Sequence, residues 1–159
     1  MSQSTISRIF WDARHRDPQD VAIKHRHGGQ WINVSWQDYV ATAEQVGAGL
    51  LSLGVRPGDR VAILSNTRYE WALADFGILG IQGVTVPIYQ SNRAEDVAFI
   101  LRDSEASVLI LEDRSQWRKF LSIRAETPSV RKVICIKPES DLPEDVMTWS
   151  DLLEEGADW

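Results

Sequence analysis

The sequence predicts an α/β fold: a mostly parallel sheet with helices on both faces, preceded by an N-terminal helix and a β-hairpin. Short apolar runs rich in valine and isoleucine recur along the 159 residues, and segments with helical spacing separate them. Apolar runs without polar alternation suit strands buried on both faces, and strand–helix–strand repetition places helices over a parallel sheet. The four strands expected in this sheet are Val61–Leu64, Val84–Ile88, Val108–Leu111 and Val133–Ile136.

The first part of the chain has a different pattern. Residues 6–15 have helical spacing, and Val21–Lys24 and Gln30–Val34 flank a Gly-Gly turn, which is typical of a hairpin. We expect this hairpin either at the edge of the main sheet or as a separate ribbon. A long helix is expected over Ser35–Leu53, with the Ser35 side chain as its cap, and Gly54 supplies the left-handed residue that ends it.

Three further helices are expected between the strands, at Tyr69–Ile81, Arg93–Arg102 and Ser115–Ala125. Thr67 and Asn92 each precede a glutamate by three positions, a spacing that predicts them as N-caps of the first two helices. Glycines at 77, 80 and 83 are spaced three apart, which predicts close packing of this helix on the sheet.

The domain organisation expected is one unit, residues 1–159, divided into three parts. Residues 1–58 supply the helix, hairpin and long helix, and residues 59–137 form a βαβαβαβ core. Residues 138–159 form an acidic loop and a short helix from about Ser150 to Glu155.

Composition and charge exclude several classes of protein. The formal net charge is −6, and eight acidic residues with no lysine or arginine follow position 138, while the first 138 residues carry 17 basic and 15 acidic ones. A nucleic-acid binder would need a basic stripe, so no nucleic-acid partner is expected. The single cysteine forms no internal disulfide, and the sequence has neither a signal peptide nor an apolar run long enough to span a bilayer. We therefore expect a cytoplasmic protein without a transmembrane segment.

Polar side chains follow the expected strands, at the carboxyl ends where open α/β sheets place ligands. Because such side chains also serve as helix caps, capping alone explains them, and for any one of them it is favoured over a ligand role. The candidates for a ligand-side loop are Ser65, Asn66 and Thr67 after one strand, Tyr89, Gln90, Ser91 and Asn92 after the next, and Glu112 and Asp113 after the third.

Other residue types that often carry chemistry are better explained by structure. Gly47 and Gly49 lie within a helical pattern rather than after a strand, so they indicate close helix packing and not a dinucleotide fingerprint. The three histidines lack metal-ligand spacing, and Cys135 lies in an apolar strand, as a core thiol does. No nucleophile–base pair, phosphate-binding loop or metal cluster can be assembled, so no catalytic, cofactor-binding or metal-binding residue is assigned.

The chain from about Phe10 to Asp113 resembles the opening of the adenylate-forming acyl-CoA synthetases, most closely the long-chain fatty-acid group. The segments that carry the resemblance are Trp31–Tyr39, Gly49-Leu50 through Val55, Pro57–Asn66, Glu70-Trp71 and Gly83–Tyr89. The Pro-Gly-Asp-Arg-Val-Ala-Ile-Leu run is specific to the superfamily, and the Val-Pro-Ile-Tyr ending points to the long-chain branch. Gln90-Ser91 departs from the Pro-Thr that often follows in this branch, which leaves the preferred acyl chain length open.

This resemblance implies a part of the large N-terminal AMP-binding domain of a ligase that uses ATP, Mg²⁺ and coenzyme A. The family's phosphate loop, its Thr-Glu pair, its ribose-binding aspartate and its C-terminal lysine have no counterpart before Trp159. We therefore expect a non-catalytic N-terminal segment that binds no cofactor itself, with the remainder of the ligase chain as its partner and a fatty acid as the parent's substrate. The parent would lie in the cytoplasm or peripherally at a membrane.

Two other hypotheses remain open. The chain could be a stand-alone α/β binding or dimerisation module derived from this family, or an unrelated nucleotide-binding α/β enzyme. Surfaces that pack against a missing remainder would stay exposed, and large exposed apolar patches favour self-association. We therefore expect a homo-oligomer.

Overall fold

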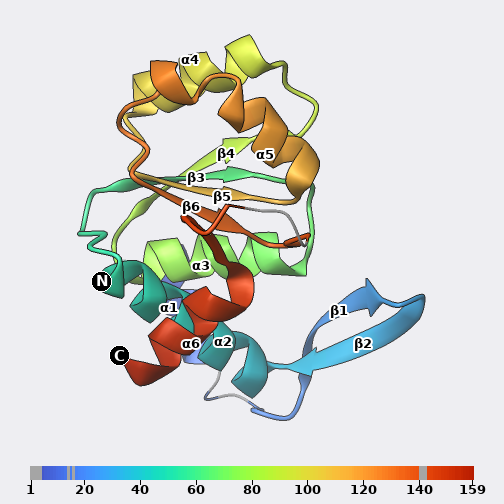
Figure 1. Ribbon diagram of the computed structural model, residues 1–159. Helices are drawn as coiled ribbons and strands as arrows, with labels where there is room; N and C mark the ends of the chain where they lie inside the picture. The colour runs from blue at the N-terminus through green and yellow to red at the C-terminus, as the bar shows by residue number, and fades with distance from the viewer. Residues whose placement is uncertain (1–4, 14, 16, 140–142) are drawn as a thin grey trace.

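A computed structural model of the chain describes residues 5–13, 15, 17–139 and 143–159. Within these residues a five-stranded sheet lies between two layers of helices, and a two-stranded ribbon projects from one side (Figure 1). The strands of the sheet are β3 (Arg60–Leu64), β4 (Val84–Ile88), β5 (Val108–Leu111), β6 (Lys132–Cys135) and β7 (Val146–Thr148). The predicted α/β class is confirmed.

The sheet has the order β4-β3-β5-β6-β7, and every neighbouring pair is parallel. The four predicted strands lie within one residue of their expected bounds. Strand β7 was not predicted, because it has only three residues and follows a segment rich in acids and prolines. It extends the sheet beside β6 and leads directly into α6 (Trp149–Asp158).

Alternate side chains of the central strands enter two separate hydrophobic cores. Val61 and Ile63 of β3 face the core that includes α2 (Trp36–Ser52) and α3 (Tyr69–Gly80). Ala62 and Leu64 face the other core, which α4 (Ala94–Ser104) and α5 (Arg114–Leu121) cover. Both faces of β3 and β5 are buried. This burial explains why the runs Val61–Leu64 and Val108–Leu111 contain apolar residues without polar alternation.

The N-terminal part forms a helix and the projecting ribbon. Helix α1 (Ile6–Ala13) packs Phe10 against Phe76 of α3, with stacked rings whose centroids are 3.8 Å apart. The hairpin of β1 (Val21–His27) and β2 (Gln30–Ser35) is a separate antiparallel ribbon, one of the two predicted placements. Residue 14, in the expected continuation of α1, lies outside the described residues.

The helix caps were predicted with mixed success. Ser35 caps α2 as expected, since its Oγ accepts a hydrogen bond from the Asp38 backbone N–H, and Gly54 has a positive φ of 84°. Thr67 and Asn92 are wrong as caps, because α3 and α4 begin one residue later, after Arg68 and Arg93. At α4 the Asp96 carboxylate instead accepts a hydrogen bond from the Arg93 backbone N–H, at 3.3 Å.

The glycines serve helix-on-helix packing. A Cβ at Gly47 would lie 3.0 Å from the Gly77 carbonyl oxygen, and one at Gly77 would lie 2.7 Å from the side chain of Val46. The expectation that Gly77 and Gly80 pack against the sheet is therefore wrong: Gly77 faces α2, and Gly80 faces Trp11 of α1. Gly49 faces α6, where an added Cβ would overlap the Leu152 backbone oxygen.

This packing predicts whether a substitution at Gly49 raises or lowers the free energy of unfolding. Helix propensity alone predicts that Gly49→Ala stabilises α2 by about 1 kcal/mol. Because the new methyl group must displace α6 at the buried Leu152, we expect a net loss of about 1–3 kcal/mol instead. Urea unfolding followed by circular dichroism measures this free energy.

The matched control is Ala41→Gly at an exposed position of the same helix, where a loss of about 1 kcal/mol from propensity alone is expected. A Gly49→Ala protein more stable than the wild type would contradict the packing assigned to α2 and α6.

Candidate functional site

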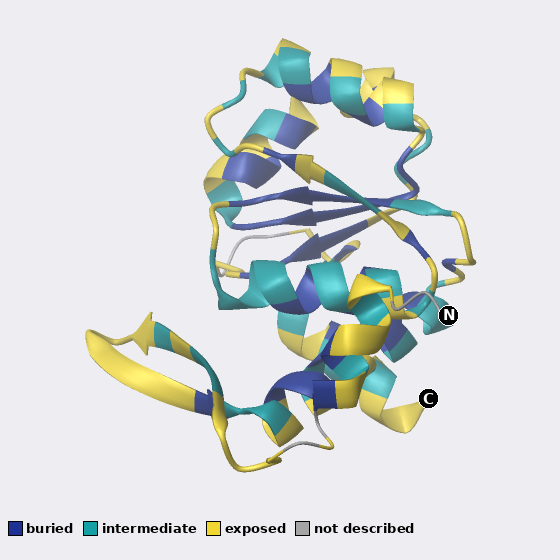
Figure 2. Ribbon diagram, turned by 180° about the vertical axis from the view of Figure 1, so that it is seen from behind, coloured by how far each residue is buried: buried dark blue, intermediate teal, exposed yellow. Residues whose placement is uncertain are grey.

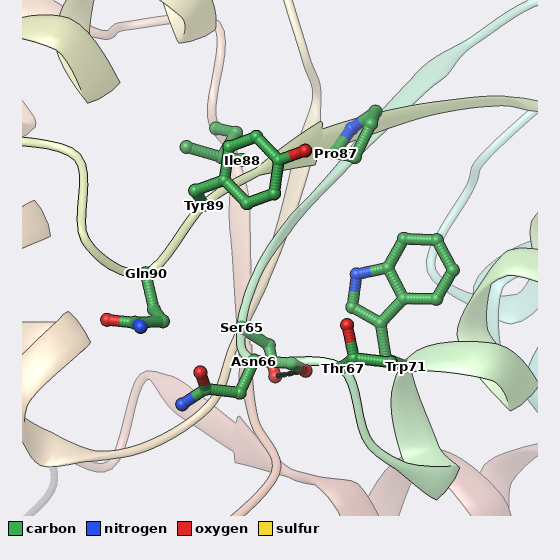
Figure 3. A pocket seen from close by; sticks show the side chains of 8 residues that line it. All are labelled: Ser65, Asn66, Thr67, Trp71, Pro87, Ile88, Tyr89 and Gln90. Atoms are coloured by element: carbon green, nitrogen blue, oxygen red, sulfur yellow. Dashed lines mark hydrogen bonds between the residues drawn. The ribbon is translucent and has the colours of Figure 1, made fainter.

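The carboxyl ends of β3 and β4 form the walls of a pocket of about 410 Å³. Figure 3 shows these side chains arranged around a common space, with Pro87 and Tyr89 on one side and the residues after β3 on the other. Five of the predicted candidates therefore lie together although two strands carry them. The lining residues are Ser65, Asn66, Thr67, Trp71, Pro87, Ile88, Tyr89 and Gln90.

The remaining candidates do not line this pocket. Ser91 and Asn92 lie in the turn between β4 and α4, where the Asn92 backbone N–H donates to the Tyr89 carbonyl. Asp113 caps α5 by accepting hydrogen bonds from the backbone N–H groups of Ser115 and Gln116, at 2.9 and 3.2 Å. Capping thus accounts for Asp113, as the alternative interpretation anticipated.

Trp71 was not among the predicted site residues, although it belongs to the pocket. It lies in the first turn of α3, directly above the loop that follows β3. The signal that could have identified it is its place in the first turn of the helix that follows β3, next to the loop that carries Ser65, Asn66 and Thr67.

The pocket offers neutral groups to a ligand. Its lining combines two aromatic rings, a proline and an isoleucine with hydroxyl and carboxamide groups, and none of these side chains is charged. Binding a triphosphate with its metal ion requires cationic side chains or carboxylate ligands. The pocket side chains themselves therefore supply neither a cation nor a carboxylate to a Mg²⁺-ATP ligand.

A buried carboxylate beside this pocket joins the ends of three strands. Glu112 follows β5 and is only 7% exposed. Its Oε2 atom accepts hydrogen bonds from the backbone N–H and side-chain Nδ2 of Asn66, at 2.9 and 3.0 Å. Its Oε1 atom is 3.2 Å from Nη1 of Arg68 and 3.3 Å from Nζ of Lys137, which follows β6. The loop after β3 is therefore tied to β5 and β6.

Opposing influences set the ionisation of this carboxylate. Burial raises the pKa of Glu112, but hydrogen bonds from Asn66 and the nearby Lys137 ammonium outweigh burial and hold the pKa below its ordinary value. Glu70 behaves similarly, because its bidentate contact with Arg68 outweighs burial and lowers its pKa. Both groups are thus kept as carboxylates and engaged within the protein.

Other residues of chemically reactive types have structural roles. Cys135 is buried in β6, and burial raises the pKa of its thiol to about 11, so the thiol stays protonated. His25 stacks on Tyr69, with ring centroids 4.5 Å apart. In the part of the chain that the structure describes, no group of histidine, cysteine and acidic residues could hold a metal ion.

Comparison with known proteins defines the class. The model of the family described as AMP-binding enzyme matches residues 10–157, and the chain belongs to this family. The fold is shared with an acetoacetyl-CoA synthetase from Streptomyces lividans, which superimposes with a TM-score of 0.83 at 23% identity, over 92% of this chain and 24% of that one.

More specific similarity is to long-chain-fatty-acid–CoA ligases. The chain is 38% identical over 131 residues to the ligase FadD15 of Mycobacterium bovis, a match that covers 82% of this chain and 22% of that protein. It is 27% identical over 155 residues to ACSBG2 of Xenopus laevis, covering 97% and 21%. A putative long-chain-fatty-acid CoA ligase structure from Rhodopseudomonas palustris gives a TM-score of 0.80 at 26% identity, over 93% and 36%. The chain spans about a fifth of the length of these curated relatives.

The Glu112 network predicts a pH-dependent stability. Because the folded-state pKa of Glu112 is depressed, its ionic contribution is fully present above the unfolded pKa of about 4.3 and is lost as pH falls through the folded value. Glu112→Gln should lower the free energy of unfolding by about 1–3 kcal/mol at pH 7, with a difference from wild type that shrinks below about pH 4.

Urea unfolding at several pH values measures this difference. The control is Glu126→Gln, which removes an exposed partner of Arg102 and should cost less than about 1 kcal/mol. A Glu112→Gln protein as stable as the control at pH 7 would refute a structural role for the network.

Proposed function

We propose that this chain is the N-terminal segment of an AMP-forming long-chain fatty-acid–CoA ligase and serves there as scaffold. The observation that carries the proposal is the 38% identity to a ligase of this kind, within a family match over nearly the whole chain. In this proposal the segment supplies the parallel sheet and the neutral pocket at its edge. The remainder of the ligase polypeptide is its partner, and that polypeptide supplies the groups that bind the nucleotide.

The reaction of the parent enzyme has two steps. A fatty-acid carboxylate oxygen attacks the α-phosphorus of ATP, and the bond to pyrophosphate breaks, which leaves an acyl-adenylate. The thiolate sulfur of coenzyme A then attacks the acyl carbon, and AMP leaves as the thioester forms. Mg²⁺ supplies charge neutralisation to the phosphates in such transfers. ATP, Mg²⁺ and coenzyme A are thus cofactors and substrates of the parent.

In this proposal the side chains of the segment hold the site residues in place and take no part in making or breaking bonds. The candidate ligand-side residues stay close together because Glu112 fixes the loop after β3, and Ser65 Oγ donates a hydrogen bond to the Asn66 carbonyl at 2.9 Å. Their charged neighbours already face one another, since Arg68 contacts both Glu70 and Glu112. This arrangement supports a rigid wall beside a substrate site, without a catalytic residue in this segment.

A segment exchange tests the proposal. Replacing the matching part of the Mycobacterium bovis ligase by residues 10–157 should give a chimera that forms palmitoyl-CoA. Small misplacements around a site cost on the order of a hundredfold in rate, so we expect activity within about that factor of the parent's. A chimera that has a native-like circular dichroism spectrum yet forms no thioester would contradict the proposal.

The isolated chain supplies the complementary measurement. With ATP, Mg²⁺ and palmitate it should release no pyrophosphate, and calorimetry should detect no heat of ATP binding. Adenylate formation or tight ATP binding by the 159 residues alone would overturn the scaffold role. It would favour an independent nucleotide-binding enzyme instead.

Self-association is also proposed, because large apolar side chains remain exposed. Ile6 and Ile9 of α1 are 71% and 52% exposed, and together with Trp36 and Phe76 they line a groove of about 350 Å³. Light scattering after size exclusion should show a dimer or larger species. Ile6→Glu combined with Ile9→Glu should shift it toward monomer, while Leu121→Glu, an exposed control on α5, should not. A wild-type monomer at all concentrations would refute self-association.

A further inference from the structure

The loop of residues 89–92 supplies the wall of the pocket that lies opposite residues 65–67 (Figure 3). It joins β4 to α4, and inside the loop the Asn92 backbone N–H donates a hydrogen bond to the Tyr89 carbonyl, at 3.0 Å. The hydrogen bonds of Glu112 hold the loop after β3. Another contact therefore sets the position of this second wall.

One ammonium group ties this loop to the helical layer above the sheet. Nζ of Lys119, in α5, donates a hydrogen bond to the Gln90 backbone carbonyl at 2.6 Å, although the two residues are 29 positions apart in the sequence. Among the residues that the structure describes, no second hydrogen bond joins the loop to another element. Because its donor is charged, this bond is stronger than one between neutral groups.

The surroundings of Lys119 disfavour its charge. The side chain is half-buried on α5, a helix with three buried residues, and the layer of α4 and α5 accordingly shows mixed burial in Figure 2. Burial lowers the pKa of Lys119, and the negative charge of Asp113 opposes this shift only in part.

A half-buried ammonium needs compensation for the water that it has lost. No carboxylate of the described residues forms an ion pair with Lys119, so the hydrogen bond to Gln90 supplies this compensation. Lys119 is not among the residues that line the pocket, and any effect on a ligand there passes through Gln90. The geometry thus favours a role in placing the loop.

We propose that Lys119 is a positioning residue, which holds the Tyr89–Gln90 wall in place for the substrate that the pocket binds. Tyr89 is 79% exposed, and its neighbour's carbonyl is the point at which the wall is fastened. Without this bond the wall has to be ordered when a substrate binds, and that ordering weakens binding. The consequence for catalysis rests on the proposed ligase function, whereas the placement of the loop does not.

Backbone ¹⁵N relaxation of the 159-residue protein tests the placement. In the wild type, Gln90 and Ser91 should have order parameters of about 0.85, as rigid backbone does. Lys119→Met keeps the aliphatic stem and removes the donor, so the values at both residues should fall below about 0.6. Ile63 within β3 should keep its wild-type value in this variant.

The matched control is Arg118→Met, which removes a cation from the adjacent, exposed position of the same helix. Its order parameters at Gln90 and Ser91 should equal those of the wild type. Unchanged values in Lys119→Met, or an equal decrease in the control, would overturn the proposal.

Steady-state kinetics of the chimera that carries residues 10–157 test the consequence for catalysis. ATP, palmitate and coenzyme A are varied in turn. Lys119→Met should raise the KM for at least one of them about tenfold and change kcat by less than about twofold, because a misplaced wall weakens binding and not the chemical step. The substrate whose KM rises is the one that occupies the pocket.

A purely structural role of Lys119 gives a different kinetic result. Fewer folded molecules would lower the apparent kcat for every substrate and leave all three KM values unchanged. That result, or equal kinetics of Lys119→Met and Arg118→Met, would contradict the positioning role. An inactive wild-type chimera counts against the ligase proposal alone, since the order parameters of the 159-residue protein still decide whether Lys119 places the loop.

Discussion

The carboxyl edge of the sheet depends on the hydrogen bonds and ion pairs that the Glu112 carboxylate makes. This carboxylate follows β5 and accepts hydrogen bonds from Asn66 after β3, while Arg68 and Lys137 bring their charges to its second oxygen. A carboxylate removed from water is costly unless such partners surround it, and here they come from both neighbouring strands. The same bonds set the position of residues 65–67, which form one wall of the pocket.

The strands were predictable because their local sequence and their final environment agree. Residues 61–64 of β3 and all of β5 are apolar, and both faces of these strands are covered. Short elements and exact boundaries were not predictable: β7 has three residues, and its place depends on pairing with β6. The predicted caps after β3 and β4 were wrong by one residue, since α3 and α4 begin after Arg68 and Arg93, two residues whose side chains form ion pairs with acids of the first helical turn.

The candidate site was predictable only in part, because strand ends indicate where side chains gather but not how they pair. Ser65–Thr67 and Tyr89–Gln90 do share a pocket. The partners of Glu112 lie 46, 44 and 25 positions away in the sequence, and no local pattern links them. The function could be predicted from the resemblance of particular segments to a known family. The residue types alone indicated only an α/β domain.

Amide hydrogen exchange at Asn66 tests the role of Glu112 most directly, since this backbone N–H donates to the buried carboxylate at 2.9 Å. In the wild type it should exchange orders of magnitude more slowly than an exposed loop amide, near the rate of the neighbouring β3 amides. In Glu112→Ala, which removes both acceptor oxygens, it should lose that protection while the amide of Ile63 within β3 keeps its own. Rapid exchange at Asn66 in the wild type, or unchanged protection in the variant, would contradict the account.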